Sequence, residues 1–192
     1  MMVPQTFIFI GRSGSGKGTQ ANLLTERLRP TPVIYIEPGE HIRKFIQTDS
    51  LAARAAEEIM RQGERHPSFL PIWLWSDILL NKFTGNEVLI FDGAARALIE
   101  AEALDGALHF FKIKQPMVIF LDVSVETATQ RLVDRGRVYD SEEENRKRFV
   151  WFERDVKPVI DYYRANQDYY RLLTIDGHKT IEEIQQAIAA SL

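Results

Sequence analysis

The sequence Gly11-Arg12-Ser13-Gly14-Ser15-Gly16-Lys17-Gly18-Thr19-Gln20 directly follows the apolar run Phe7-Ile8-Phe9-Ile10. Its glycines permit turn conformations that residues with a Cβ avoid, so consecutive N–H groups can point inward at a polyphosphate. A helix that begins near Lys17 adds its positive end, and the lysine ammonium reaches the β- and γ-phosphates. The pattern G-x-x-x-x-G-K therefore predicts a phosphate-binding loop between a buried strand and a helix.

One position departs from the general form of such a loop. Gly18 stands where serine or threonine usually follows the lysine, and we expect Thr19, one residue later, to take the role on the magnesium side. The alternative interpretation is a glycine-rich turn that binds no ligand. The strand pattern before the loop and the helical pattern after it favour phosphate binding.

The composition limits the classes of protein to which the chain can belong. With 192 residues it is long enough for one α/β core, and no change in composition suggests a second domain. A net charge of −3 disfavours broad binding to nucleic acids or anionic membranes, and the absence of cysteine excludes disulfides and thiolate zinc sites. No apolar run approaches the roughly 20 residues of a membrane span. We therefore expect a cytoplasmic protein with no nucleic-acid or membrane partner.

Short apolar runs alternate with longer stretches of helical periodicity, which is typical of a parallel sheet covered by helices. Pro158 predicts a kink in the longest of these helices. Three helices between the second and third strands, where one would suffice, predict a small helical insertion at the carboxyl edge of the sheet. The expected strands are 7–10, 33–36, 88–91, 118–121 and 172–175. The expected helices are 18–28, 40–48, 51–62, 68–82, 97–111, 125–135, 142–163 and 181–190.

A carboxylate and a group of arginines add to the phosphate loop. Asp92 ends the third expected strand, where a carboxylate can hold magnesium or its waters, although an aspartate that merely starts a turn is the alternative. Arginine side chains are planar and permanently charged, so a group of them can neutralise a phosphoryl group during its transfer. The alternative interpretation is that these arginines form salt bridges between two helices, with residues 142–144 as partners. Because the phosphate loop is also present, we interpret this group of arginines as phosphate-binding. Its members are Arg131, Arg135, Arg137, Arg146 and Arg148.

Residues 11–20 resemble the nucleotide loop of adenylate kinases, in the wider family of nucleoside monophosphate (NMP) kinases. In that family the loop has the sequence Gly-Lys-Gly-Thr, as it does here at 16–19. The family signature Asp-Gly-Phe-Pro-Arg is similar to Asp92-Gly93-Ala94-Ala95-Arg96, and Ser-Thr-Gly-Asp-x-x-Arg is similar to Glu37-Pro38-Gly39-Glu40-x-x-Arg43. Residues 135–149 resemble its arginine-rich lid and following helix, and residues 175–179 resemble its adenine-contacting loop. The motifs span nearly the whole chain in the family's order.

The resemblance implies a single domain of three-layer P-loop NTPase fold, a five-stranded parallel sheet flanked by helices. Its parts are a core at 1–36, 88–134 and 142–192, an NMP-binding subdomain at 37–87 and a reduced lid at 135–141. It also implies reversible transfer of the γ-phosphoryl group from ATP to an NMP, first of all AMP, with Mg²⁺ as the cofactor of ATP. Because short-lid relatives are commonly monomers, a monomer is expected.

The resemblance further implies which side chains act, by their positions in the motifs. The expected catalytic residues are Lys17, Arg96, Arg135, Arg137 and Arg148. The ATP-binding residues are Gly14, Ser15, Gly16, Lys17, Gly18, Thr19, Arg131, Arg135 and Lys179. The NMP-binding residues are Pro38, Gly39, Arg43, His66, Gly93, Arg96, Glu100, Arg137 and Arg148. Magnesium is expected through waters near Thr19, Asp92 and Glu40, with no zinc.

Two departures from the family pattern concern the acceptor base. Glu100 corresponds to the family's adenine-facing glutamine, and Pro38 to its base-sensing threonine. A carboxylate only accepts hydrogen bonds, whereas an amide both donates and accepts, so Glu100 would suit adenine's amine or the two adjacent donors of guanine. The alternative is that Glu100 turns outward on its helix.

Other functions stay open from the sequence alone. A UMP/CMP-type or other NMP kinase would share every motif. A catalytically impaired nucleotide-binding regulator would share the scaffold, although it would not need the acceptor arginines Arg43 and Arg96. A kinase of a sugar or similar metabolite would explain the first motif and leave residues 37–43 and 92–96 without a role.

Overall fold

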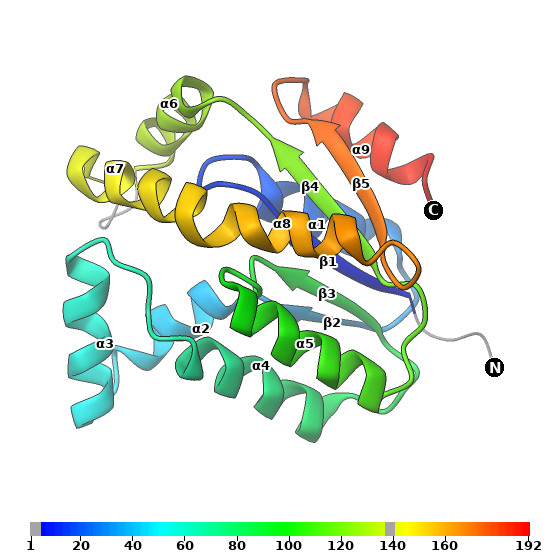
Figure 1. Cartoon of the computed structure of the whole chain (residues 1–192), viewed down its shortest axis with the longest axis horizontal. Helices are drawn as coiled ribbons and strands as arrows, with labels where there is room; N and C mark the ends of the chain where they lie inside the picture. The colour runs from blue at the N-terminus through cyan, green and yellow to red at the C-terminus, as the bar shows by residue number, and fades with distance from the viewer. Residues whose placement is uncertain (1–4, 137–140) are drawn as a thin grey trace.

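The computed structural model describes residues 5–136 and 141–192. Within them, five strands form one parallel sheet in the order β2-β3-β1-β4-β5 (Figure 1). The expected parallel sheet is confirmed, with bounds that differ from the predicted ones by a few residues. The strands are β1 Thr6–Ile10, β2 Val33–Ile36, β3 Val88–Asp92, β4 Met117–Asp122 and β5 Arg171–Asp176.

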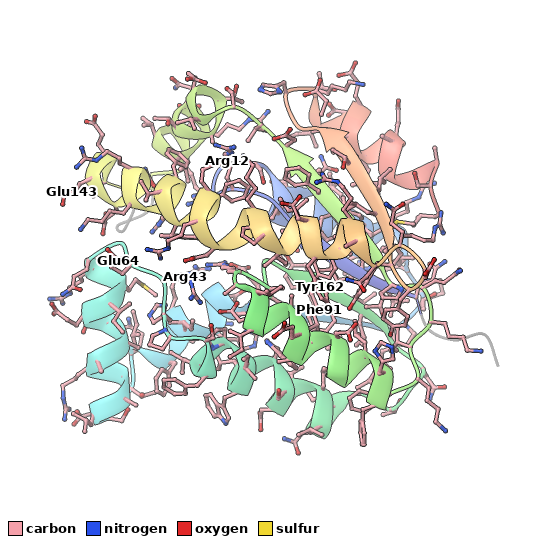
Figure 2. All side chains as sticks on the ribbon, viewed as in Figure 1. Arg12, Arg43, Glu64, Phe91, Glu143 and Tyr162 are labelled. Carbon is pink, nitrogen blue, oxygen red and sulfur yellow. The ribbon has the colours of Figure 1, made fainter. Side chains whose placement is uncertain are left out.

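Helices cover both faces of the sheet, because alternate residues of a strand point to opposite faces. Ile8 and Ile10 of β1 belong to a core under α4, α5 and α8, in which Phe91 and Tyr162 also pack (Figure 2). Phe7 belongs to a second core under α1 and α9. The helices are α1 Lys17–Arg27, α2 Pro38–Phe45, α3 Leu51–Arg61, α4 Phe69–Lys82, α5 Leu98–Phe110, α6 Val125–Arg135, α7 Glu142–Trp151, α8 Lys157–Ala165 and α9 Ile181–Ala189.

The helical insertion between β2 and β3 consists of α2, α3 and α4 (Figure 1). Ile42, Ile46, Ala56 and Leu70 form a small core of its own. Trp75 of α4, in contrast, is buried in the core of the sheet. The insertion therefore packs partly on itself and is attached to the sheet through α4.

The expected single helix over 142–163 is interrupted. It runs as α7, then as a π-helical segment η1, Phe152–Val156, and then as α8. Pro158 lacks an N–H and its ring crowds the carbonyl four residues earlier, which explains why the regular ladder breaks just before it. The proline predicted the place of the disruption, and the structure shows its form to be a π turn.

The connection between α6 and α7 is short. Gly136 ends α6 with a left-handed backbone, at φ 60°, and α7 begins at Glu142, where Ser141 forms a capping box with Glu144. Most of the lid expected at 135–141, including Arg137, lies outside the described residues. In the part of the chain that the structure describes, no helix has the length and apolar character needed to cross a bilayer.

Candidate active site

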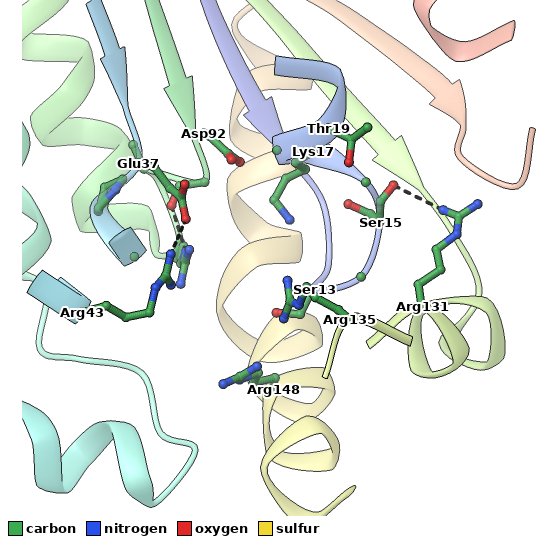
Figure 3. Close-up of a pocket in the computed structure, with 18 of the residues that line it drawn as sticks. Ser13, Ser15, Lys17, Thr19, Glu37, Arg43, Asp92, Arg131, Arg135 and Arg148 are labelled. Atoms are coloured by element: carbon green, nitrogen blue, oxygen red, sulfur yellow. Dashed lines mark hydrogen bonds and ion pairs between the residues drawn. The ribbon is translucent and has the colours of Figure 1, made fainter. Parts of the chain in front are cut away.

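A pocket of about 1110 Å³ lies at the carboxyl ends of the strands, between the phosphate loop and the helical insertion (Figure 3). Ligand pockets commonly have volumes of roughly 300–1,000 Å³, so this one is larger than the usual range. The strand order explains its place, because β1 lies between β3 and β4 and the chain turns to opposite sides of the sheet there.

The phosphate loop has the predicted strand–loop–helix form. Gly16 precedes α1 with φ 92°, and a Cβ on Gly14, at φ 82°, would collide with the carbonyl of Ala128. Nζ of Lys17 donates to the carbonyl oxygens of Gly11 at 2.8 Å and Arg12 at 2.9 Å, so the ammonium closes the loop from inside. Among the described residues no side chain caps α1, which leaves its first N–H groups for an anion.

Asp92 faces the start of α1 from the end of β3. Oδ2 of its buried carboxylate accepts a hydrogen bond from Oη of Tyr35 at 3.0 Å. A Cβ on Gly18 would lie only 3.1 Å from the same Oδ2, so glycine at this position lets the helix approach the carboxylate. Burial raises the pKa of Asp92, and the nearby Lys17 ammonium opposes this shift.

Two arginines of the acceptor motifs converge beside Gly39. A Cβ there would lie 3.3 Å from Nη1 of Arg43 and 3.5 Å from Nη2 of Arg96. Nε of Arg96 donates to the carbonyl of Gly93 at 2.8 Å, and Nη2 of Arg43 donates to Oε1 of Glu37 at 2.8 Å. Two guanidiniums at one point suit an anionic group such as a phosphate, and the Glu37 carboxylate partly neutralises them here.

Three further arginines line the pocket from α6 and α7 (Figure 3). Nη1 of Arg131 donates to the carbonyl of Ser15 in the phosphate loop at 3.5 Å. Arg135 and Arg148 lie across the pocket from the insertion. Burial lowers the pKa of Lys17 to about 8, and repulsion from Arg96 and Arg135 contributes in the same direction. Bound anions would relieve this accumulation of positive charge.

Glu100 is buried at the base of the pocket, with 1% of its side chain exposed, so the alternative that it turns outward is wrong. Its Oε1 accepts from Nη1 of Arg65 at 2.7 Å and from Oγ of Ser68 at 2.9 Å. Its Oε2 accepts from the backbone N–H of Arg96 at 2.8 Å. The carboxylate is thus occupied by three donors of the protein and is not offered free to a base.

The family model for adenylate kinase matches residues 9–168 of this sequence. The chain belongs to the adenylate kinase family. It is similar to the adenylate kinase of Azobacteroides pseudotrichonymphae, with 31% identity over 95% of this chain and 94% of the relative. It is also similar to adenylate kinase 1 of Nostoc sp., with 31% identity, and to the adenylate kinase of Stenotrophomonas maltophilia, with 33% identity. Each of these two matches covers 96% of this chain and 97% of the relative.

Adenylate kinases are phosphotransferases, and the structure brings nearly all residues expected from that family to one pocket. Every expected ATP-binding residue lines it, from Gly14 in the loop to Lys179 before α9. All expected NMP-binding residues other than Arg137, which lies outside the described residues, line it as well. His66 is among them, and its Nε2 donates to the carbonyl of Ala56 at 2.9 Å.

Glu40 is the expected site residue, among those that the structure describes, that does not line the pocket, although its charge acts on Tyr35 beside Asp92. Its carboxylate pairs with Nζ of Lys44 at 2.6 Å on the exposed face of α2, and it is not among the residues that line the pocket. The reason is helical geometry, because Glu40 and Lys44 share one face while Gly39 and Arg43 share the neighbouring one. Its expected role near magnesium, through waters, stays a prediction.

Sequence reasoning missed Arg65 and Tyr35. Arg65 lines the pocket and holds Glu100, and Tyr35 holds Asp92. A signal for Arg65 was available, because a glutamate predicted on the inner face of a helix requires a cationic or hydrogen-bonding partner when it is buried. The sequence could not say which of the 24 lysines and arginines would supply it.

Proposed function

We propose that this enzyme reversibly transfers the γ-phosphoryl group of ATP to AMP. The observation that carries the proposal is the junction of the two sides of the pocket at Gly93. A Cβ on Gly93 would lie 3.2 Å from Nη2 of Arg96, on the acceptor side, and 3.7 Å from Cε of Lys17, on the donor side. A site for two phosphate groups in contact is what a direct transfer between nucleotides requires.

The residues of the pocket suit a reaction that needs alignment and charge neutralisation instead of a covalent intermediate. Lys17 and the loop N–H groups would hold the β- and γ-phosphates of ATP, while Arg43 and Arg96 would hold the phosphate of AMP. Arg135 and Arg148 would neutralise the group in transit, with Arg137 expected to join them. Closure around the nucleotides would exclude water and so limit hydrolysis of ATP.

The residues beside the loop fit magnesium bound together with ATP. Mg²⁺ is usually held by one or two carboxylates, waters and substrate phosphates. The buried carboxylate of Asp92, at the end of β3, and the exposed side chain of Thr19, in the first turn of α1, line the same pocket and fit that mode. When bound, the ion would supply positive charge that offsets the charge of the phosphates. We propose that Asp92 and Thr19, with Glu40 nearby, would order its waters.

We also propose that α2 and α3 form the acceptor-binding part of the single domain and that the short α6–α7 connection acts as its lid. The separate small core of the insertion supports the first assignment. The resemblance to short-lid relatives supports a monomer, and the absence of cysteine is compatible with the cytoplasm. The mass of the protein in solution tests the monomer.

A coupled assay for ADP tests the proposed function. We expect ADP formation from ATP and AMP with magnesium, no comparable rate with ATP alone, and formation of ATP when only ADP is supplied. Addition of EDTA should abolish transfer in both directions. A protein that binds ATP and AMP but forms no ADP would instead be the nucleotide-binding regulator.

The affinity for ATP is expected to fall as the pH rises above 8. Lys17, with a pKa of about 8, is charged below that pH and attracts the phosphates, and it becomes neutral above it. Metal-free titration calorimetry with ATP should show a constant affinity just below pH 8 and a loss of up to about tenfold per pH unit above it. Lys17→Arg, which keeps its charge, should bind with little pH dependence, and an equal slope in both proteins would exclude Lys17 as the cause.

A further inference from the structure

Arg65 and Glu100 both line the pocket and form an ion pair. Arg65 belongs to the segment between α3 and α4, and its guanidinium is fixed by two carboxylates from different parts of the fold. Nη1 donates to Oε1 of Glu100 at 2.7 Å, and Nε donates to Oδ2 of Asp155, in the π segment η1, at 3.2 Å. Nη1 also donates to Oγ of Ser68 at 2.9 Å. A guanidinium held from two sides has a defined orientation.

The same contacts leave one nitrogen of this guanidinium for a ligand. Nη2 of Arg65 has no hydrogen-bond partner among the described residues and is not among their buried atoms. Arg65 has 23% of its side chain exposed and lines the nucleotide pocket, as do His66 and Pro38. The Glu100 carboxylate, by contrast, is buried behind it. A nucleotide in this part of the pocket therefore meets a cationic donor.

We propose that Arg65, positioned by Glu100 and Asp155, is the residue that reads the acceptor base. The proposal rests on the proposed function and concerns which NMPs the enzyme accepts. At the position where the family resemblance places an adenine-facing amide, the carboxylate of Glu100 is used to hold a guanidinium. The group that faces the base consequently only donates hydrogen bonds, whereas an amide would donate one and accept one.

A donor-only group changes the preference among bases. The ring nitrogens of adenine and the keto oxygens of guanine and uracil accept hydrogen bonds, whereas the exocyclic amine of adenine donates. AMP remains an acceptor through its ring nitrogens, but its amine finds no partner in Arg65. GMP and UMP offer keto oxygens, which suit a charged donor. The enzyme should therefore accept keto-bearing NMPs beside AMP.

Steady-state kinetics with a panel of acceptors tests this inference. Values of kcat/KM for AMP, GMP, CMP and UMP are compared in the wild type, Arg65→Met and Glu100→Gln. We expect wild-type values for GMP or UMP within about 100-fold of that for AMP. Arg65→Met should lower kcat/KM for keto-bearing acceptors at least tenfold more than for AMP, the scale of a lost hydrogen bond to a charged group. Glu100→Gln should also lower kcat/KM for keto-bearing acceptors relative to that for AMP, and KM for ATP should stay unchanged.

Arg154→Met is the matched control. Arg154 donates to the same Asp155 at 2.8 Å, but it is 65% exposed and does not line the pocket, so its loss should leave the acceptor ratio unchanged. Thermal unfolding of each variant reports folding, and Arg65→Lys, which keeps the charge beside both carboxylates, replaces Arg65→Met if the latter does not fold. For that substitute the same ratio is expected to fall, because an ammonium lacks the planar fork.

The outcomes separate the two proposals. An acceptor ratio that is equal in the wild type and the folded Arg65 variants would overturn the inference and leave Arg65 a structural residue. Wild-type kcat/KM values for GMP and UMP more than about 1,000-fold below that for AMP would overturn it as well. If the wild type transfers phosphate to none of the four acceptors, the proposed function fails and the inference with it.

Discussion

Arg96→Met is expected to lower kcat for ADP formation by at least about 10³-fold, the scale on which a single arginine stabilises phosphoryl transfer. Arg96 lies where the two sides of the pocket meet, with Nη2 beside both Gly39 and Gly93. Its Nε bond to the carbonyl of Gly93 fixes the guanidinium before any substrate binds. The measurement is kcat at saturating ATP and AMP in the coupled assay.

The fold should survive this change, because Arg96 holds Glu100 through its backbone N–H, which methionine retains. Arg96→Lys should recover only part of the rate, since an ammonium lacks the bidentate fork. Arg54→Met is the matched control, because Arg54 is 63% exposed on α3, pairs with Asp49 and does not line the pocket. A loss of less than tenfold in kcat for Arg96→Met would show that Arg96 does not contact the transferring group.

Lys17→Met is expected to lower kcat/KM for ATP by about 10³-fold. Removal of one preorganised donor at a developing charge costs about 10²–10³ in rate, and Lys17 also contributes to binding of the donor phosphates in the ground state. The methionine side chain leaves the carbonyls of Gly11 and Arg12 without the donor that they have at 2.8 Å and 2.9 Å. Steady-state kinetics with varied ATP and calorimetry with ATP would separate the loss in rate from the loss in binding.

Lys44→Met serves as the control for Lys17, because Lys44 is 73% exposed, pairs with Glu40 and lies outside the pocket lining. It should retain wild-type kinetics. If Lys17→Met kept more than a tenth of the wild-type kcat/KM, the loop N–H groups alone would have to hold the phosphates. The melting temperature should fall by no more than about 4–8 °C, because the two lost hydrogen bonds are each worth about 1 kcal/mol.

Much of the fold was predictable because its signals are local. Each buried strand is a short apolar run, and capping boxes of neighbouring residues at Ser141 and Thr180 begin α7 and α9. Pro158 predicted a break in the long helix, but the form of the break depends on packing, since η1 buries Phe152 and Val156 in the core of the sheet. Helix ends shifted by up to three residues, as at α2, which was expected over 40–48 and runs over Pro38–Phe45.

The sequence predicted most of the residues that line the site, but it did not predict which side chains bind one another there. Motif order placed Lys17, Asp92 and Arg96 at neighbouring strand ends, because the carboxyl ends of parallel strands meet at one edge of the sheet. The absence of Glu40 from the pocket lining depends on the first residue of α2, since a helix that begins at Pro38 turns Gly39 and Arg43 to the pocket and lets Glu40 pair with Lys44. Such a rotation of about 100° per residue is not fixed by spacing alone when the start of the helix is uncertain.

The phosphate loop followed from the sequence by itself. The freedom of Gly14 and Gly16 at positive φ and the order of strand, loop and helix are properties of some ten consecutive residues. The partner of Glu100 was decided only by the tertiary structure. Arg65 is 35 positions away along the chain, and the buried carboxylate takes whichever cation the packing of the α3–α4 segment against α5 brings within reach. The residues that bind the donor phosphates are thus adjacent in the sequence and can be predicted from it. The ion pair between Arg65 and Glu100, in contrast, joins distant residues and is visible only in the tertiary structure.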